Sequence, residues 1–176
     1  MKKSALGILV PLVAIAMTAG LSTAANAGIG GPTSLSVGAF WPSSDDASST
    51  GGGTQLNADL RYHVPAKNNT LNVPSRTVFD VGIEAGATDG AHSTIVPVTI
   101  GEEIGLSNQS PLAVNNGFLG AGIGVYFVDQ SFITSSAELG GYVNAGYNIS
   151  ASTFVEGKYQ FADHGDGPML DVGFRF

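Results

Sequence analysis

Histidine and serine side chains are the first candidates for catalysis, because a hydroxyl nucleophile needs a base within hydrogen-bond reach. The chain has three histidines, His63, His92 and His164, and Ser93 directly follows His92. Adjacency in sequence does not aim a hydroxyl at an imidazole ring, and no catalytic motif surrounds any of the three. We therefore expect no catalytic residue and no enzymatic activity.

Two further segments contain residues that could bind a cation or a phosphate group. The segment DHGDG at 163–167 offers carboxylate oxygens, but it departs from the calcium-loop pattern and is typical of a solvated turn. Gly120, Gly122 and Gly124 recur at every second position. That spacing is not the spacing of a phosphate-binding glycine loop, and no helical pattern follows it. The sequence thus predicts neither a metal nor a cofactor.

Composition limits the classes of protein to consider. Charged residues make up 12 % of the chain, whereas ordinary soluble domains contain about 25 %. The chain has no cysteine, so no disulfide supports it. Acidic residues outnumber basic ones by fourteen to seven, which argues against a nucleic-acid partner.

The first 27 residues have the pattern of a secretory signal. Lys2 and Lys3 precede an apolar run, and the small-residue sequence Ala25-Asn26-Ala27 follows it. We interpret 1–27 as a signal peptide cleaved after Ala27 and 28–176 as a single domain. A retained membrane anchor is the alternative, although the run is short and contains Pro11.

Beyond residue 28 the chain alternates apolar with polar or small residues, the period of a strand with two different faces. No apolar stretch there is long enough for a membrane helix, and no helix is required. Clusters of Gly, Ser, Asn, Asp and Pro separate the alternating segments and predict turns. We expect eight strands, at 34–41, 55–64, 78–87, 94–104, 117–127, 138–147, 155–161 and 169–176. Eight antiparallel strands joined in sequence close into an all-β, up-and-down barrel.

The placement of charge indicates which face of the strands points inward. If the apolar face were inside, the protein would be a soluble, lipocalin-like binding barrel with too few charges on its surface. If that face is outside, it forms a lipid-facing band, and the barrel is a transmembrane one. Nearly all strand charges fall on the polar face, and only Glu102 is out of phase. We therefore predict an interior ionic network of Asp59, Arg61, Asp80, Glu84, Glu138, Glu156, Lys158, Asp171 and Arg175.

The same orientation accounts for the positions of the aromatic residues and the glycines. Aromatic side chains near strand ends match interfacial girdles. The predicted girdle comprises Trp41, Tyr62, Phe127, Tyr147, Tyr159 and Phe161. Inside so narrow a barrel, small residues must alternate with large ones. Gly120, Gly122 and Gly124 are accordingly expected to make room for bulky neighbours such as Tyr126, Tyr142 and Arg175.

Several short motifs follow one another in the order seen in a known family. They are VGAFWPS at 37–43, VPVTIG at 96–101, GFLGAGIGVYF at 117–127, VEGKYQF at 155–161 and LDVGFRF at 170–176. With these motifs the mature chain resembles the small eight-stranded outer-membrane barrels of diderm bacteria. That group includes the membrane domain of outer-membrane protein A and the outer-membrane protein W type. The resemblance implies residence in the outer membrane, with outer-membrane lipid as a partner.

The resemblance also implies a role for the end of the chain. In that family the barrel assembly machinery reads an aromatic residue at the end of the last strand, which corresponds here to Phe176, with Phe174 and Val172 beneath it. Alternatively, Phe176 is one more lipid-facing side chain. An even strand count places both termini on the periplasmic side. The expected outer loops are then 43–54, 88–93, 129–135 and 162–168, and the periplasmic segments 65–76 and 105–116 are as long as any of them.

The sequence leads to one main functional hypothesis and two alternatives. The main hypothesis is a non-enzymatic integral outer-membrane barrel with a structural role or a narrow interaction at the cell surface. One alternative is a small channel or transporter for apolar solutes, as in the outer-membrane protein W type. The other is the soluble periplasmic binding barrel. The sequence identifies no ligand.

Overall fold

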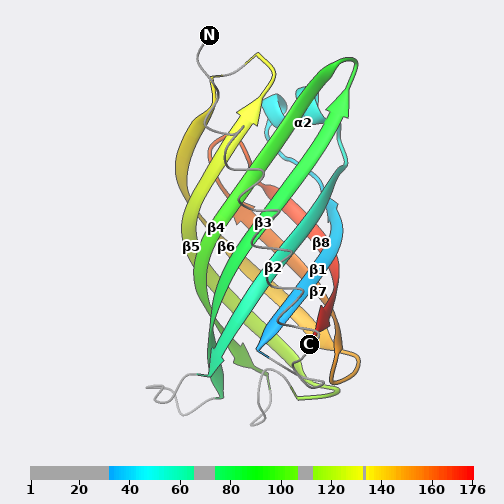
Figure 1. The fold of residues 1–176 in the computed structure, drawn as a ribbon, viewed down its shortest axis with the longest axis vertical. Helices are drawn as coiled ribbons and strands as arrows, with labels where there is room; N and C mark the ends of the chain where they lie inside the picture. Colours follow the sequence, from blue (N-terminus) through cyan, green and yellow to red (C-terminus); the bar gives the residue numbers. More distant parts are fainter. Residues whose placement is uncertain (1–31, 66–73, 107–112, 133) are drawn as a thin grey trace.

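The computed structural model describes residues 32–65, 74–106, 113–132 and 134–176. The predicted signal peptide therefore lies outside the described residues. The chain forms a closed antiparallel barrel in which each strand pairs with the next and β1 pairs with β8 (Figure 1). The strands are β1 (Thr33–Phe40), β2 (Gln55–Pro65), β3 (Ser75–Thr88), β4 (Ala91–Gly105), β5 (Gly117–Gln130), β6 (Ser136–Asn148), β7 (Thr153–Phe161) and β8 (Gly167–Arg175).

The eight predicted strands are confirmed, and the largest difference lies in one connection. The segment 88–93, predicted as an outer loop, is mostly strand, because β3 and β4 continue to a turn at Asp89 and Gly90. Both residues have positive φ angles, 49° and 81°. This backbone matches the right-handed twist of a hairpin and is favoured by an Asp-Gly pair. The β3–β4 hairpin consequently projects past the neighbouring strands (Figure 1).

The two ends of the barrel differ, and we name them by what they contain. The terminal end holds the start of β1, the end of β2, the start of β3 and the end of β8. The helix end holds α2 (Asp45–Gly51), a short helix between β1 and β2 (Figure 1). Among the described residues, no helix has the length and apolar character to cross a membrane.

The helix α2 corrects the expectation that no helix is present. Ser44 caps its N-terminus by accepting a hydrogen bond from the Ala47 N–H at 3.4 Å, and Asp45 and Asp46 in the first turn favour the helix dipole. Ala47 is fully buried, and its carbonyl accepts a hydrogen bond from Gln55 Nε2 at 3.0 Å. A helix of only seven residues is too short to show an amphipathic pattern in the sequence.

Side chains fill the barrel interior, and glycines leave room for the largest of them. A β-carbon at Gly122 would lie 2.4 Å from Cε1 of Tyr142, and one at Gly146 would lie 2.1 Å from Cζ of Phe118. The predicted pairing of small with large residues is therefore present for Tyr142. Tyr126 instead packs over Gly140, and Arg175 packs on Phe154.

The interior changes character along the barrel axis. Toward the helix end it contains a buried apolar cluster of Phe40, Ile95, Tyr126, Val128, Ala162 and Met169. Toward the terminal end the buried side chains are mostly charged or amide-bearing. The outward face is apolar, since Leu139, Leu56 and Ile123 are 86 %, 78 % and 70 % exposed. This is the inverse of a soluble barrel, which buries its apolar face.

Candidate functional site

The buried charges meet around Arg61, which β2 directs into the lumen. Its Nη1 and Nη2 atoms donate to Oε2 and Oε1 of Glu156 on β7, both at 2.6 Å. The same guanidinium lies 3.4 Å from Asp59 and 3.5 Å from Asp80. The fork geometry suits a bidentate pair between a guanidinium and a carboxylate. Because β2 and β7 are not hydrogen-bonded neighbours, this pair connects two separate parts of the barrel wall.

Lys158 supplies the second buried cation of the network. Its Nζ atom donates to Asp59 at 3.0 Å and to Asp80 at 3.2 Å. The two carboxylates therefore share Lys158 and Arg61 between them. Pairing of this kind offsets the cost of removing the charges from water. Five of the predicted network residues thus come together at one level: Asp59, Arg61, Asp80, Glu156 and Lys158.

Three interacting residues of the interior are missing from the predicted network. Arg76 Nε donates to Glu103 Oε2 at 2.6 Å, and Asn144 bridges Glu103 and Glu156 at 2.9 and 3.0 Å. Glu103 and Asn144 lie on the polar faces of their predicted strands, and that signal could have identified them. Arg76 could not be found in this way because it precedes the predicted start of β3.

Three predicted members are buried without an ion pair to any described residue. Glu84 accepts from Gln160 Nε2 at 2.6 Å, and Asp171 accepts from Asn57 Nδ2 at 2.9 Å. Arg175 donates to Asn148 Oδ1 at 2.5 Å and lies 4.5 Å from the centroid of the Phe154 ring. Amide side chains and an aromatic ring therefore substitute for counter-charges at these positions.

Glu138 lies at the helix end, apart from the other predicted network members. Its Oε1 is 2.6 Å from Nδ1 of His164, and its Oε2 accepts from the His164 N–H at 3.0 Å. The His164 carbonyl in turn accepts from Ser44 Oγ and Gln130 Nε2, at 3.0 and 3.1 Å. His164 therefore joins the β7–β8 connection to β5, β6 and the cap of α2.

We expect this contact to make the helix end sensitive to pH. The hydrogen bond to the Glu138 carboxylate raises the pKa of His164 above its ordinary value of 6.5. Stabilisation from the pair is thus fully present below that ordinary value and is lost as the pH rises through the raised pKa. An NMR titration of the His164 ring measures this directly. In Glu138→Gln the midpoint should fall back toward 6.5, and an unchanged midpoint would contradict the assignment.

His92 has a serine partner, but not the one adjacent in sequence. Its Nδ1 lies 2.9 Å from Oγ of Ser131, and its Nε2 lies 3.9 Å from Asp129, while Ser93 is buried. The Ser131 hydroxyl also accepts the His92 N–H at 2.9 Å. The 3.9 Å separation is too long for the hydrogen bond that orients a catalytic base. The arrangement thus ties a loop to a strand and lacks the geometry of an activated nucleophile.

The segment 163–167 is a turn that hydrogen-bonds to the barrel. The Gly165 N–H donates to Ala162 O at 3.2 Å, and the Gly165 carbonyl accepts from Gln160 Nε2 at 2.6 Å. Asp166 lies 3.5 Å from the Tyr159 hydroxyl. Within the described ranges, no three His, Asp or Glu side chains are grouped to hold a metal ion.

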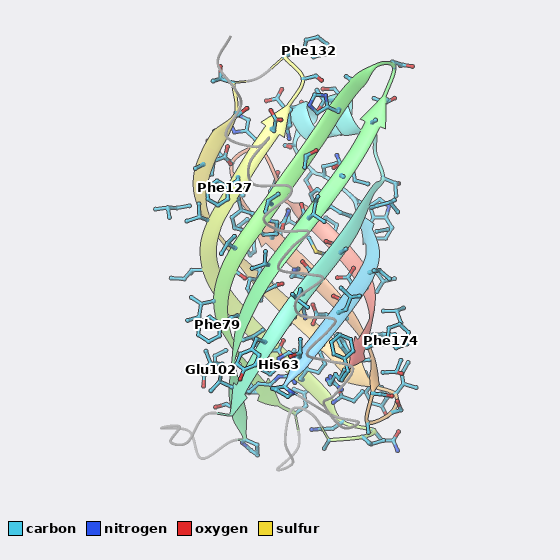
Figure 2. The ribbon with its side chains drawn as sticks, in the orientation of Figure 1. His63, Phe79, Glu102, Phe127, Phe132 and Phe174 are labelled. Carbon is cyan, nitrogen blue, oxygen red and sulfur yellow. The ribbon has the colours of Figure 1, made fainter. Side chains whose placement is uncertain are left out.

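Aromatic side chains on the outer wall lie at two levels along the axis. At the helix end are Trp41, Phe127, Tyr159 and Phe161, with the last two rings 4.9 Å apart. Near the terminal end are Tyr62 and Tyr147, about half exposed at 52 % and 47 %. Phe79 and Phe174 join this lower level (Figure 2) and are absent from the predicted girdle.

No known family model and no curated protein matches the chain. Several solved structures resemble it, including these two. The outer membrane protein Ail of Yersinia pestis, in a phospholipid bilayer nanodisc, has 16 % sequence identity and a TM-score of 0.52, with 83 % of this chain and 99 % of Ail covered. Neisserial surface protein A has 14 % identity and a TM-score of 0.51, with 81 % and 94 % covered.

These likenesses confirm the predicted fold, a small eight-stranded barrel of the outer-membrane type. At such low sequence identity they establish the fold alone. Neither structure is an outer-membrane protein A or W, so the finer resemblance to those two types stays a prediction.

Proposed function

We propose that the chain is a non-enzymatic integral protein of a diderm outer membrane, exported through a cleaved signal peptide. Its role is structural or a narrow interaction at the cell surface. The observation that carries this proposal is the distribution of side chains across the barrel wall, with charged residues on the inside and apolar residues on the outside. Asp59, Glu84 and Glu103 are 0 % exposed inside. The outward acids of the described strands, Glu102 and Asp129, lie within three residues of a strand end. Between these levels the outer wall offers lipid a charge-free band.

Heat-modifiability tests this proposal. The detergent-solubilised membrane fraction is run on SDS gels with and without boiling. A folded outer-membrane barrel should resist SDS in the cold and change its mobility on boiling. Recovery in the soluble periplasmic fraction without a mobility shift would support the soluble binding barrel instead. That alternative is disfavoured because the interior carries the charges and the exterior carries exposed leucines such as Leu56, Leu139 and Leu170.

The channel alternative is also disfavoured, because buried side chains fill the helix end and the middle of the lumen. The apolar cluster with Phe40 and Tyr126 fills the helix end, and the Arg61–Glu156 pair spans the middle. Conductance across a planar bilayer separates the two functions. A structural barrel should give a flat baseline at all voltages, whereas a channel should conduct and respond to Tyr126→Ala.

We also propose that Phe176, Phe174 and Val172 are read by the barrel assembly machinery. Phe174 and Val172 are 51 % and 42 % exposed on β8. Phe176 follows the last residue of that strand, and its N–H donates to Thr33 O at 3.0 Å. These residues therefore form an accessible apolar edge at the terminal end.

Deleting Phe176 should strongly reduce the amount of heat-modifiable protein in cells. The free energy of unfolding of the refolded barrel should fall by only about 0.5 to 1.5 kcal/mol, the worth of the lost hydrogen bond to Thr33. The control is Phe79→Ala, which removes another outward aromatic side chain and should leave assembly in cells unaffected. If the deletion instead lowered stability in vitro and left assembly intact, Phe176 would be only a lipid-facing side chain.

A further inference from the structure

Three buried cationic or imidazole side chains at the terminal end have hydrogen-bond donors without a partner. Arg175 uses Nη2 for Asn148, while its Nε and Nη1 atoms have no partner. Arg76 uses two nitrogens for Glu103, while its Nη1 has none. His63 contacts Ser34 Oγ through Nε2 at 2.9 Å, and its Nδ1 has no partner. All three side chains are 3 % exposed, a burial at which unpartnered donors are costly.

The strand order brings these residues to one place. Arg175 is on β8, Ser34 on β1, His63 on β2 and Arg76 on β3, which are consecutive strands of the barrel. Arg175 pairs in register with Ser34, whose hydroxyl reaches His63. Arg76 and Arg175 lie close enough to repel each other, and both act electrostatically on His63. His63 is seen at the terminal end in Figure 2.

Aromatic rings hold the two guanidinium groups in position. Arg76 lies 5.4 Å from the Phe118 ring centroid, and Arg175 lies 4.5 Å from that of Phe154. The two rings are in edge-to-face contact, with centroids 6.1 Å apart. Packing on a ring orients a guanidinium but provides no hydrogen-bond acceptor for its N–H groups. The donors are therefore fixed in place and remain available.

Arg76 and Arg175 share one nearby carboxylate, Glu103, at this end. Glu103 pairs with Arg76, and Arg175 has no carboxylate of a described residue within ion-pair distance. The connecting segments 66–73 and 107–112 contain no Asp or Glu in their sequence. Asn148 and the Phe154 ring are therefore the close partners of Arg175, and a bound anion would add the directly paired negative charge that they do not provide.

We propose that Arg175, Arg76 and His63 form a binding site for a phosphate group at the terminal end of the lumen. Arginine forks match the geometry of phosphate oxygens and bind them with charge-assisted hydrogen bonds. Two guanidinium groups also suit the one to two negative charges of phosphate better than the single charge of a carboxylate. When Ser34 donates to His63 Nε2, Nδ1 carries a hydrogen and adds a neutral donor. The group belongs either to free phosphate or to the headgroup of a phospholipid in the adjacent leaflet.

Inorganic phosphate is the first probe. The mature protein, folded in a phosphate-free, non-ionic detergent, is titrated with phosphate at constant ionic strength, and its unfolding midpoint is recorded. A ligand that binds only the folded state should raise the midpoint progressively with concentration. Arg175→Gln should weaken the apparent affinity by about tenfold or more, since it removes charge-assisted hydrogen bonds. Lys67→Gln removes the same charge two residues after the end of β2 at a position that is not one of the three proposed ligands, so it is the matched control for net charge.

A second arm distinguishes the two sources of the phosphate group. A short-chain phospholipid is added to the same micelles without free phosphate, and its ³¹P signal is followed. A shift with the wild-type protein that is lost in Arg175→Gln identifies a headgroup, and a response to inorganic phosphate alone identifies the free ion. The proposal is overturned if neither probe binds, or if Arg175→Gln and Lys67→Gln respond like the wild type. It is also overturned if both variants lose the response equally.

Discussion

Arg61→Ala should lower the free energy of unfolding by about 3 to 5 kcal/mol, the cost of breaking a buried ion pair from one side. The loss leaves Glu156 with Asn144 as its remaining hydrogen-bond partner, and it leaves Asp59 and Asp80 to share Lys158. Equilibrium unfolding in urea, followed through Trp41, the single tryptophan of the chain, measures this. Ser36→Ala is the matched control, because Ser36 is buried on the same face and its hydroxyl has no partner.

A double-mutant cycle measures the interaction energy between Arg61 and Glu156 separately from the contacts that each makes with other residues. Replacing Arg61 and Glu156 together with methionine removes both charges, so the double variant should be destabilised by less than the sum of the two single variants. If Arg61→Ala cost no more than Ser36→Ala, water would have to solvate the remaining carboxylates. A lumen wet enough for that would favour the channel alternative.

Ile123→Arg should lower the free energy of unfolding in phospholipid vesicles by about 2 to 4 kcal/mol, the cost of a cation at the bilayer midplane. Ile123 is 70 % exposed, lies midway along β5, and pairs in register with Ile100 and Gly141. Its side chain therefore has lipid as its main environment in the proposed orientation. The same substitution at the half-exposed Val98 of β4 should be destabilising in the same direction.

Leu56→Arg is the control for depth in the membrane. Leu56 is 78 % exposed and is the second residue of β2, at the helix end of the barrel. Near an interface the cost of arginine falls to about 0 to 1 kcal/mol. Equal effects at Ile123 and Leu56 would mean that the exposed apolar band does not face lipid. The inward placement of the charged residues, which supports the membrane role, would then need another explanation.

Strand alternation was sufficient to predict which residues share a face. Side chains in a strand alternate strictly between the two faces, so the position of Arg61 relative to Leu60 and Tyr62 is a local property of β2. The same reasoning placed Lys158 and Glu156 inside and Ile123 outside. Composition then decided between the two orientations of the barrel, because a surface with so little charge suits lipid better than water.

Contacts across the lumen could not be predicted in this way. Arg61 and Glu156 are separated by 95 residues, and they meet because barrel closure and strand stagger set the level of each strand. Neither quantity can be read from a local pattern. For the same reason, the pairing of Arg76 with Glu103 could not be predicted. Glu138 was grouped with the central charges, although it lies at the helix end, because its level along the axis also depends on strand stagger.

Elements that form only by packing against the closed barrel also could not be predicted from the sequence. The helix α2 is too short to be stable alone, and it forms where Ala47 packs into the end of the lumen. The four donors on Arg175, Arg76 and His63 become a cluster only when β8 pairs with β1 and closes the sheet. Local alternation and composition were thus enough to predict the strands, their faces and the barrel. Which buried charges meet and which remain unpaired depends on barrel closure, because closure brings strands that are distant in sequence to the same level.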